Sequence, residues 1–170
     1  MNSPRIVVMA GSSRREALSR KVAAACVAPL AAAGADVDLV ELADHPAPLY
    51  NGDLEVESGL PEGIVSLQRR LAAADGLLVV NPEYNGSITP LLKNALDWCS
   101  RPNPADRARS GGAVYAGRAA AVVGTSPGAL GGCVVEAPQP ALPGPSRMAR
   151  TSARAWSNTC SAWVGSKSLA

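Results

Sequence analysis

Apolar residues along the chain occur in short continuous runs that alternate with stretches of helical spacing. The runs at 5–10, 76–80 and 118–124 have the length that is typical of strands. A further strand is expected at 37–42, where apolar and charged residues alternate as on a sheet with one covered face. The run at 76–80 is apolar throughout, which indicates a central parallel strand buried on both faces.

Helical spacing follows each of the strands expected at 5–10, 37–42 and 76–80. The apolar positions that define the three helices are Leu18, Val22 and Cys26, then Ile64, Leu67 and Leu71, and finally Leu91, Leu92, Ala95 and Trp98. Pro29 is expected to bend or end the first helix, because proline removes a backbone donor at a cost of about 3 kcal/mol in a helix interior. Residues 43–60 are rich in Pro, Asp and Gly and are expected to form a long loop.

Strands and helices therefore alternate along the chain. Such alternation predicts a doubly wound α/β fold, in which a parallel sheet with right-handed crossovers is the middle of three layers and helices cover both faces. Ligands of these sheets bind beyond the carboxyl ends of the strands. Loops of unusual composition leave those ends at 11–19, 81–90 and 124–132, and we expect them to build one site.

Length and composition fit a single domain and exclude several kinds of protein. The 170 residues are 47% hydrophobic and 18% charged, which is typical of a globular chain with its own core. No apolar run reaches the roughly 18 residues that a membrane span requires, and the first residues lack the features of a signal peptide, so a cytoplasmic protein is expected. A net charge of +2 is too small to indicate nucleic-acid binding.

Neither metal nor thiol chemistry is indicated. The four cysteines are scattered without CxxC spacing, and a single histidine, His45, excludes a multi-histidine metal site. His45 stands in a proline-rich loop and is expected to be exposed and without function. No residue is assigned as a general acid or base.

The first loop, 11–19, combines small hydroxyl residues with Arg14 between a strand and a helix start. Backbone N–H groups at a helix N-terminus lack partners and carry partial positive charge, so they attract anions. The Arg14 guanidinium suits phosphate, and Ser12, Ser13 and Ser19 can donate further hydrogen bonds. The loop matches neither GxGxxG nor the P-loop pattern. A serine helix cap beside a solvated arginine is the alternative interpretation.

The second loop follows the central strand and opens with Pro82, Glu83, Tyr84, Asn85 and Gly86. The proline restrains the backbone, and the glycine lets the chain turn closely past a ligand. A tyrosine ring offers a flat face and the turn offers backbone donors and acceptors, which together suit a flat polar heterocycle. The alternative is a plain strand-to-helix turn with Asn-Gly as its turn residues.

The segment 82–98, PEYNGSITPLLKNALDW, resembles the signature of the NAD(P)H-dependent FMN reductase family, which includes chromate, quinone and azo-dye reductases. Two further landmarks of that family match in the same order, at 11–14 (GSSR) and in the Gly-rich segment 124–132. The resemblance covers about residues 5–132. It implies a flavodoxin-like FMN-binding domain over residues 1–132.

The resemblance also implies roles for individual residues. In the family the first loop holds the FMN phosphate, and the matching residues here are Ser12, Arg14 and Ser19. The second loop passes along the ribityl chain and the isoalloxazine ring, and the matching residues are Pro82, Glu83, Tyr84, Asn85 and Gly86. The third loop closes on the ring, and the matching residues are Ser126 and Gly128.

Two departures from the family lie in the first loop. Ala17 stands where the family often has a serine, and Ser19 stands where it has an asparagine. One phosphate hydroxyl is therefore missing and one side chain is shorter, so weaker binding of FMN is expected.

As the resemblance implies, NADPH or NADH would reduce bound FMN and leave, and a small electron acceptor such as a quinone would take its place, with ping-pong kinetics. Family members are commonly dimers or tetramers, so a homodimer or homotetramer is expected. Two alternatives are an FMN-binding electron carrier that does not turn over NAD(P)H and an inactive homologue.

Residues 133–170 depart from the family. Four prolines follow in quick succession, four basic residues stand against one acidic residue, and no apolar run predicts a strand. The family has an amphipathic helix, a fifth strand and a final helix there, so an incomplete or aberrant C-terminal strand and helix, with an uncovered sheet edge, is expected. We interpret the segment as an atypical tail, produced by a change of reading frame near Cys133 or specific to this lineage. Resequencing the locus tests the frame change, which requires that a neighbouring frame encode the missing helix and strand.

Overall fold

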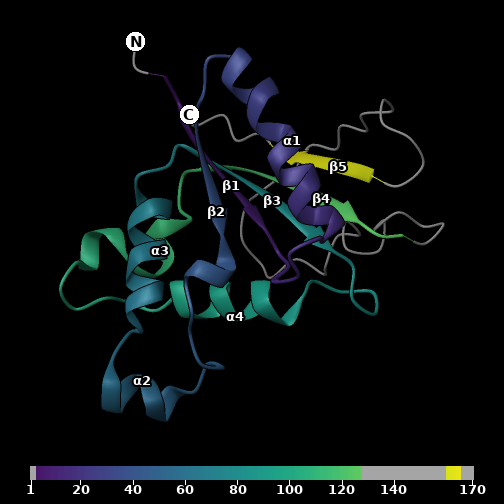
Figure 1. The fold of residues 1–170 in the computed structure, drawn as a ribbon. Coiled ribbons are helices and arrows are strands. Elements are labelled where there is room, and N and C mark those ends of the chain that lie inside the picture. Colours follow the sequence, from purple (N-terminus) through teal and green to yellow (C-terminus); the bar gives the residue numbers. More distant parts are fainter. Residues whose placement is uncertain (1–2, 128–159, 166–170) are drawn as a thin grey trace.

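The computed structural model describes residues 3–127 and 160–165 (Figure 1). The strands are β1 (Arg5–Ala10), β2 (Asp36–Glu41), β3 (Gly76–Pro82), β4 (Ala119–Thr125) and β5 (Cys160–Gly165). The α-helices are α1 (Leu18–Ala32), α2 (Gly52–Ser58), α3 (Glu62–Ala72) and α4 (Pro90–Cys99). Short 3-10 turns are η1 (Leu42–Asp44), η2 (Arg107–Arg109) and η3 (Gly111–Val114).

The strands form one sheet in the order β2-β1-β3-β4-β5. The first four are parallel, and Val8 of β1 lies beside Leu39 of β2 and Leu78 of β3. From β1 the chain crosses to β2 on one side and then returns to β3 on the other, so the topological switch point lies between β1 and β3. In open α/β sheets, ligands bind at the carboxyl edge beside such a point.

Helices cover both faces of the sheet, as the alternation predicted (Figure 1). Val8 and Ala10 of β1 pack under α1 in a smaller core, whereas Val7 and Met9 enter the larger core beneath α3 and α4. Successive side chains of a strand point to opposite faces, which is why one strand serves both cores. Within residues 3–127, no helix has the length and apolar character to cross a bilayer.

The strands and helices expected from apolar spacing are all present, with small shifts at their ends. Helix α1, however, continues through Pro29 to Ala32. The proline stands in the last turn, where it removes only its own bond, and Ala33 N–H still donates to Pro29 O at 3.0 Å. The chain leaves the helix at Gly34, whose φ of 91° suits glycine.

The expectation of a loop at 43–60 is wrong in part, because the segment includes the end of η1 and all of α2. Asn51 caps α2, and its side chain accepts a hydrogen bond from Asp53 N–H at 2.9 Å. No residue of α2 is fully buried, and the partly buried Leu54 packs against the core, so the apolar face of this seven-residue helix is too short for a periodicity search to detect.

The expectation of an uncovered β4 edge is also wrong, whereas the expected aberrant C-terminal strand is present as β5. β5 pairs antiparallel with β4, with Val123 beside Ala162. An open edge presents a row of unpaired N–H and C=O groups, and an extended segment can satisfy them without an apolar pattern of its own. The rest of 133–170 lies outside the described residues, so the tail boundary and the change of frame stay predictions.

Candidate functional site

The ends of β1, β3 and β4, from which the predicted loops leave, lie side by side at the carboxyl edge of the sheet (Figure 1). Gly11 N–H donates to Val80 O at 2.8 Å, which joins the first loop to the end of β3. Glu83 N–H donates to Thr125 O at 2.9 Å, which joins the second loop to the end of β4. The prediction that these loops come together is therefore confirmed as far as residue 127, and residues 128–132 of the third loop lie outside the described residues.

Helix α1 begins without a side-chain cap, because its N-cap residue is the buried Ala17. The first N–H groups of a helix have no partner within it, so they are available to an anion here. Ser19, in the first turn, is 0% exposed, and its Oγ has no hydrogen-bond partner among the described residues. An unpaired buried hydroxyl costs about 1–3 kcal/mol. A bound group that pairs with Ser19 would recover part of that free energy.

The charges near this helix start favour an anion. The Lys21 ammonium lies 2.9 Å from the Glu16 carboxylate, and its hydrogen bond lowers the pKa of Glu16. Arg14 is exposed and forms no ion pair with a described residue. The buried Ser12 Oγ accepts a hydrogen bond from Arg14 N–H at 3.3 Å, which leaves the serine hydrogen free to be donated.

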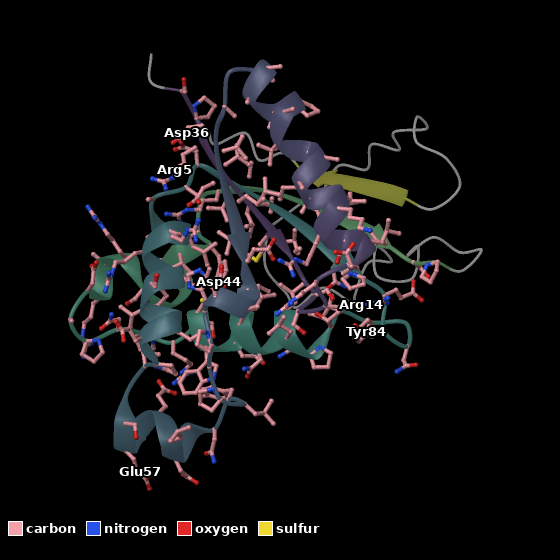
Figure 2. All side chains as sticks on the ribbon, viewed as in Figure 1. Arg5, Arg14, Asp36, Asp44, Glu57 and Tyr84 are labelled. Carbon is pink, nitrogen blue, oxygen red and sulfur yellow. The ribbon has the colours of Figure 1, made fainter. Side chains whose placement is uncertain are left out.

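The second loop turns back as a two-residue hairpin. Tyr84 N–H donates to Ser87 O at 3.0 Å, and Ser87 N–H donates to Tyr84 O at 3.1 Å. Asn85 and Gly86 between them have φ of 53° and 74°, the positive pair that a type I′ turn requires. Tyr84 is 49% exposed, so the turn leaves much of its ring open, and Figure 2 shows it at the same end of the sheet as Arg14. The Asn-Gly turn, which the sequence offered as the alternative to a ligand-binding loop, is therefore present. It also leaves the Tyr84 ring exposed at the candidate site.

The remaining predicted residues lie at the ends of β3 and β4. Pro82 ends β3 beside Thr125, and Glu83 follows it. The Oε2 atom of Glu83 is buried and has no hydrogen-bond partner in the described part of the chain. Ser126 comes directly after β4 and is half-buried. Gly128 lies outside the described residues.

Gly11, Asn81 and Thr89 stand between the loops, and the sequence pattern assigned none of them to the site. A Cβ atom at Gly11 would clash with Asn81 Oδ1, so a larger residue requires the buried, hydrogen-bonded Asn81 side chain to move. Asn81 and Thr89 are 0% and 2% exposed. A threonine before Pro90 is a helix-start signal that marks Thr89. No local pattern marks the other two.

His45 is buried, so the expectation that it is exposed is wrong. Its Nδ1–H donates to Gly63 O at 3.1 Å, which leaves Nε2 to accept from Arg70 Nη1 at 3.4 Å. A Cβ atom at Gly63 would lie 2.6 Å from Pro46 O, so the glycine permits the close approach of this loop to α3. The histidine joins the segment after β2 to α3.

The strand order and the site at the carboxyl ends of β1, β3 and β4 define a flavodoxin-like α/β protein. The chain belongs to the NADPH-dependent FMN reductase family, whose model matches residues 4–142. The match confirms the resemblance found in the sequence and extends beyond the expected limit at residue 132.

Individual relatives agree with the family. The chain is 39% identical over 132 residues to a 2-hydroxy-1,4-benzoquinone reductase from Burkholderia sp., which covers 78% of this chain and 66% of the relative. It is 40% identical over 127 residues to a quinone reductase from Pseudomonas putida. That match covers 75% of this chain and 62% of the relative. The chain thus spans just under two thirds of the length of these relatives.

A solved structure extends the comparison to the fold. The structure of FerB, a flavoenzyme NAD(P)H:(acceptor) oxidoreductase from Paracoccus denitrificans, superimposes with a TM-score of 0.61 at 32% identity. The superposition covers 79% of this chain and 67% of FerB.

Proposed function

We propose that this chain is an oxidoreductase that holds FMN at the three loops, accepts electrons from NADPH or NADH, and passes them to a quinone-like or other small acceptor. The observation that carries the proposal is the uncapped start of α1 with the buried, unpaired Ser19 hydroxyl beside the switch point. Family membership and the quinone reductases among the relatives support it.

The first loop is proposed to bind the phosphate. The open N–H groups of α1, the Arg14 guanidinium and the hydroxyls of Ser12 and Ser19 form a donor set that suits a dianion. Ala17 supplies no hydroxyl to that set. A flavin without phosphate cannot use these donors, so we expect it to bind more weakly than FMN.

The other loops are proposed to bind the ribityl chain and the ring. The exposed Tyr84 ring offers a flat face, and the type I′ turn holds it in place. The Pro82–Glu83 backbone and Gly86 border the same loop, and the proposed residues of the third loop are Ser126 and Gly128. The unpaired Glu83 Oε2 is a candidate acceptor for a ribityl hydroxyl.

Bound FMN supplies a ring that accepts hydride from a nicotinamide and returns electrons to an acceptor, and the protein supplies binding, orientation and electrostatics. No described side chain is assigned as a general acid or base. We further propose that the protein works in the cytoplasm and forms a homodimer or homotetramer. Sedimentation velocity on the purified protein measures its oligomeric state.

The test is spectroscopic. The purified protein is incubated with FMN and freed of unbound flavin by gel filtration. Separate anaerobic samples are mixed with NADPH and with NADH, and a benzoquinone is added last to each. We expect a yellow complex that bleaches with one of the nicotinamides and regains its colour with the quinone. A yellow complex that bleaches with neither indicates an electron carrier, and protein that FMN cannot make yellow contradicts the proposal.

A further inference from the structure

Three buried polar side chains stand where the loops of the site leave the sheet: Asn81, Thr89 and Thr125. They are 0%, 2% and 1% exposed. Buried polar groups are costly unless they are hydrogen-bonded, so the bonds that these residues make show which parts of the chain they hold together.

Thr89 joins the first loop to the second. Its hydroxyl is close enough to donate to Gly11 O and also lies 3.4 Å from Asn81 Oδ1. The Gly11 oxygen is the nearer of the two, so the single hydroxyl hydrogen goes to it. The Thr89 hydroxyl oxygen, Oγ1, also caps α4 by accepting a hydrogen bond from Leu92 N–H at 3.2 Å. One side chain therefore fixes the start of α4 against the backbone of the loop that leads into α1.

Asn81 closes the second loop upon itself. Its Nδ2 donates to Pro82 O at 2.7 Å, at the start of the loop, and its Oδ1 accepts from Thr89 N–H at 3.3 Å, at the end. Thr125 Oγ1 donates to Asn81 O at 3.4 Å and so adds the end of β4. Asn81 thus shapes one loop, whereas the Thr89 hydroxyl connects two.

We propose that Thr89 is a positioning residue that fixes the distance between the phosphate end and the ring end of the flavin site, and so favours FMN over riboflavin. The proposal rests on the proposed function, because it takes the first loop as the phosphate end and the second loop as the ring end. A ligand that contacts both loops gains from their fixed separation, since less ordering remains to be done on binding. Riboflavin lacks the phosphate and contacts only the ring end, so it gains little from the Thr89–Gly11 bond.

The experiment compares dissociation constants of FMN and riboflavin, measured by quenching of flavin fluorescence on the full-length apoprotein. Thr89→Val removes the hydroxyl and keeps the shape of the side chain, and Thr89→Ser keeps the hydroxyl. Asn51→Ala, which removes the cap of α2, is the matched control for loss of a helix cap. If Thr89→Val does not fold, as judged by thermal unfolding, Thr89→Ala removes the same hydroxyl and takes its place.

We expect Thr89→Val to raise the dissociation constant of FMN at least tenfold and that of riboflavin less than threefold. For Thr89→Ser and Asn51→Ala, both dissociation constants should stay within threefold of the wild-type values. Equal weakening of both flavins, or no weakening of either, overturns the positioning role while leaving the proposed function intact. Wild-type protein that binds neither flavin overturns the proposed function and this inference with it.

Discussion

Ala17 and Ser19, two neighbours at the start of α1, determine how well this helix end can hold a phosphate. The alanine leaves the first N–H groups without a side-chain cap, and the serine hydroxyl is buried without a partner among the described residues. A protein tuned only for stability would gain from removing such a hydroxyl, because it is desolvated and unpaired. A bound ligand that pairs with this hydroxyl would offset that cost.

Ser19→Ala separates ligand binding from stability. We expect the variant to bind FMN about tenfold more weakly, because a hydrogen bond to a charged group is lost. The apoprotein should unfold at the same or a slightly higher urea concentration, because an unpaired buried group is removed. Ser58→Ala, at the exposed end of α2 and outside the three loops, is the control and should change neither quantity. A clear loss of apoprotein stability in Ser19→Ala contradicts this account.

Gly11→Ala tests the close contact between the first loop and β3. The added Cβ would lie 2.4 Å from Asn81 Oδ1 and 3.3 Å from Thr89 Oγ1. Forcing an atom into a packed interior costs about 1–3 kcal/mol, so we expect a loss of that size in urea unfolding and weaker FMN binding. Gly112→Ala is the control, because its Cβ would meet nothing within 4 Å. Equal stability of the two variants in urea unfolding would falsify the claim that Gly11 is needed for close packing against Asn81.

Among the elements, α1 carries an avoidable weakness at Pro29. This exposed proline lies inside the helix and cannot donate to the carbonyl of the preceding turn. We expect Pro29→Ala to stabilise the protein by about 1–2 kcal/mol, measured by thermal unfolding, since part of the helix gain is offset by the freer unfolded chain. Pro90→Ala should give no gain, because proline at the first position of α4 sacrifices no helical bond.

An ion pair joins β2 to α3 and makes stability depend on pH. Asp38 accepts hydrogen bonds from Arg70 and, at 3.1 Å, from Arg5. The hydrogen bond from Arg70 lowers the pKa of Asp38 below its ordinary value. The ion pair therefore contributes fully to stability at pH values above the ordinary aspartate pKa of about 3.9. This contribution is lost as the pH falls through the lowered pKa of Asp38 in the folded protein.

Asp38→Asn should lower the free energy of unfolding by about 1–2 kcal/mol at pH 7. This loss is smaller than for a fully buried ion pair, because the Arg70 side chain is one-third exposed. The difference from wild type should narrow as the pH falls below about 4. Urea unfolding across this range measures both effects. Asp36→Asn is the control, since Asp36 is exposed on the same strand and forms no ion pair with a described residue. A difference that stays constant with pH contradicts the ion-pair explanation.

At the scale of the whole molecule, the sheet depends on β5 to cover β4. Six register pairs join the two strands, from Ala120 beside Gly165 to Thr125 beside Cys160. An uncovered β4 would present unpaired backbone groups at the edge nearest the third loop. The segment 160–165 therefore bears on both association and the site.

Ending the chain after residue 159 should leave the β4 edge open. We expect concentration-dependent association beyond that of the full chain, measured by sedimentation velocity, together with weaker FMN binding. A chain that ends after residue 165 keeps β5 and is the control. Identical sedimentation of the two shortened chains contradicts a covering role for β5.

The sequence alone determined strands β1 to β4, helices α1, α3 and α4 and the three loops of the site, because apolar periodicity and turn residues act over a few neighbours. It missed α2, which has no fully buried residue. The signature 82–98 likewise placed Tyr84 and the Asn85–Gly86 turn without any distant contact. Only the tertiary structure decided the burial of His45 and the pairing of β5. It also decided the bond between Thr89 and Gly11, which are 78 residues apart. Such contacts depend on which surfaces the chain brings together, and no local pattern of residues encodes them.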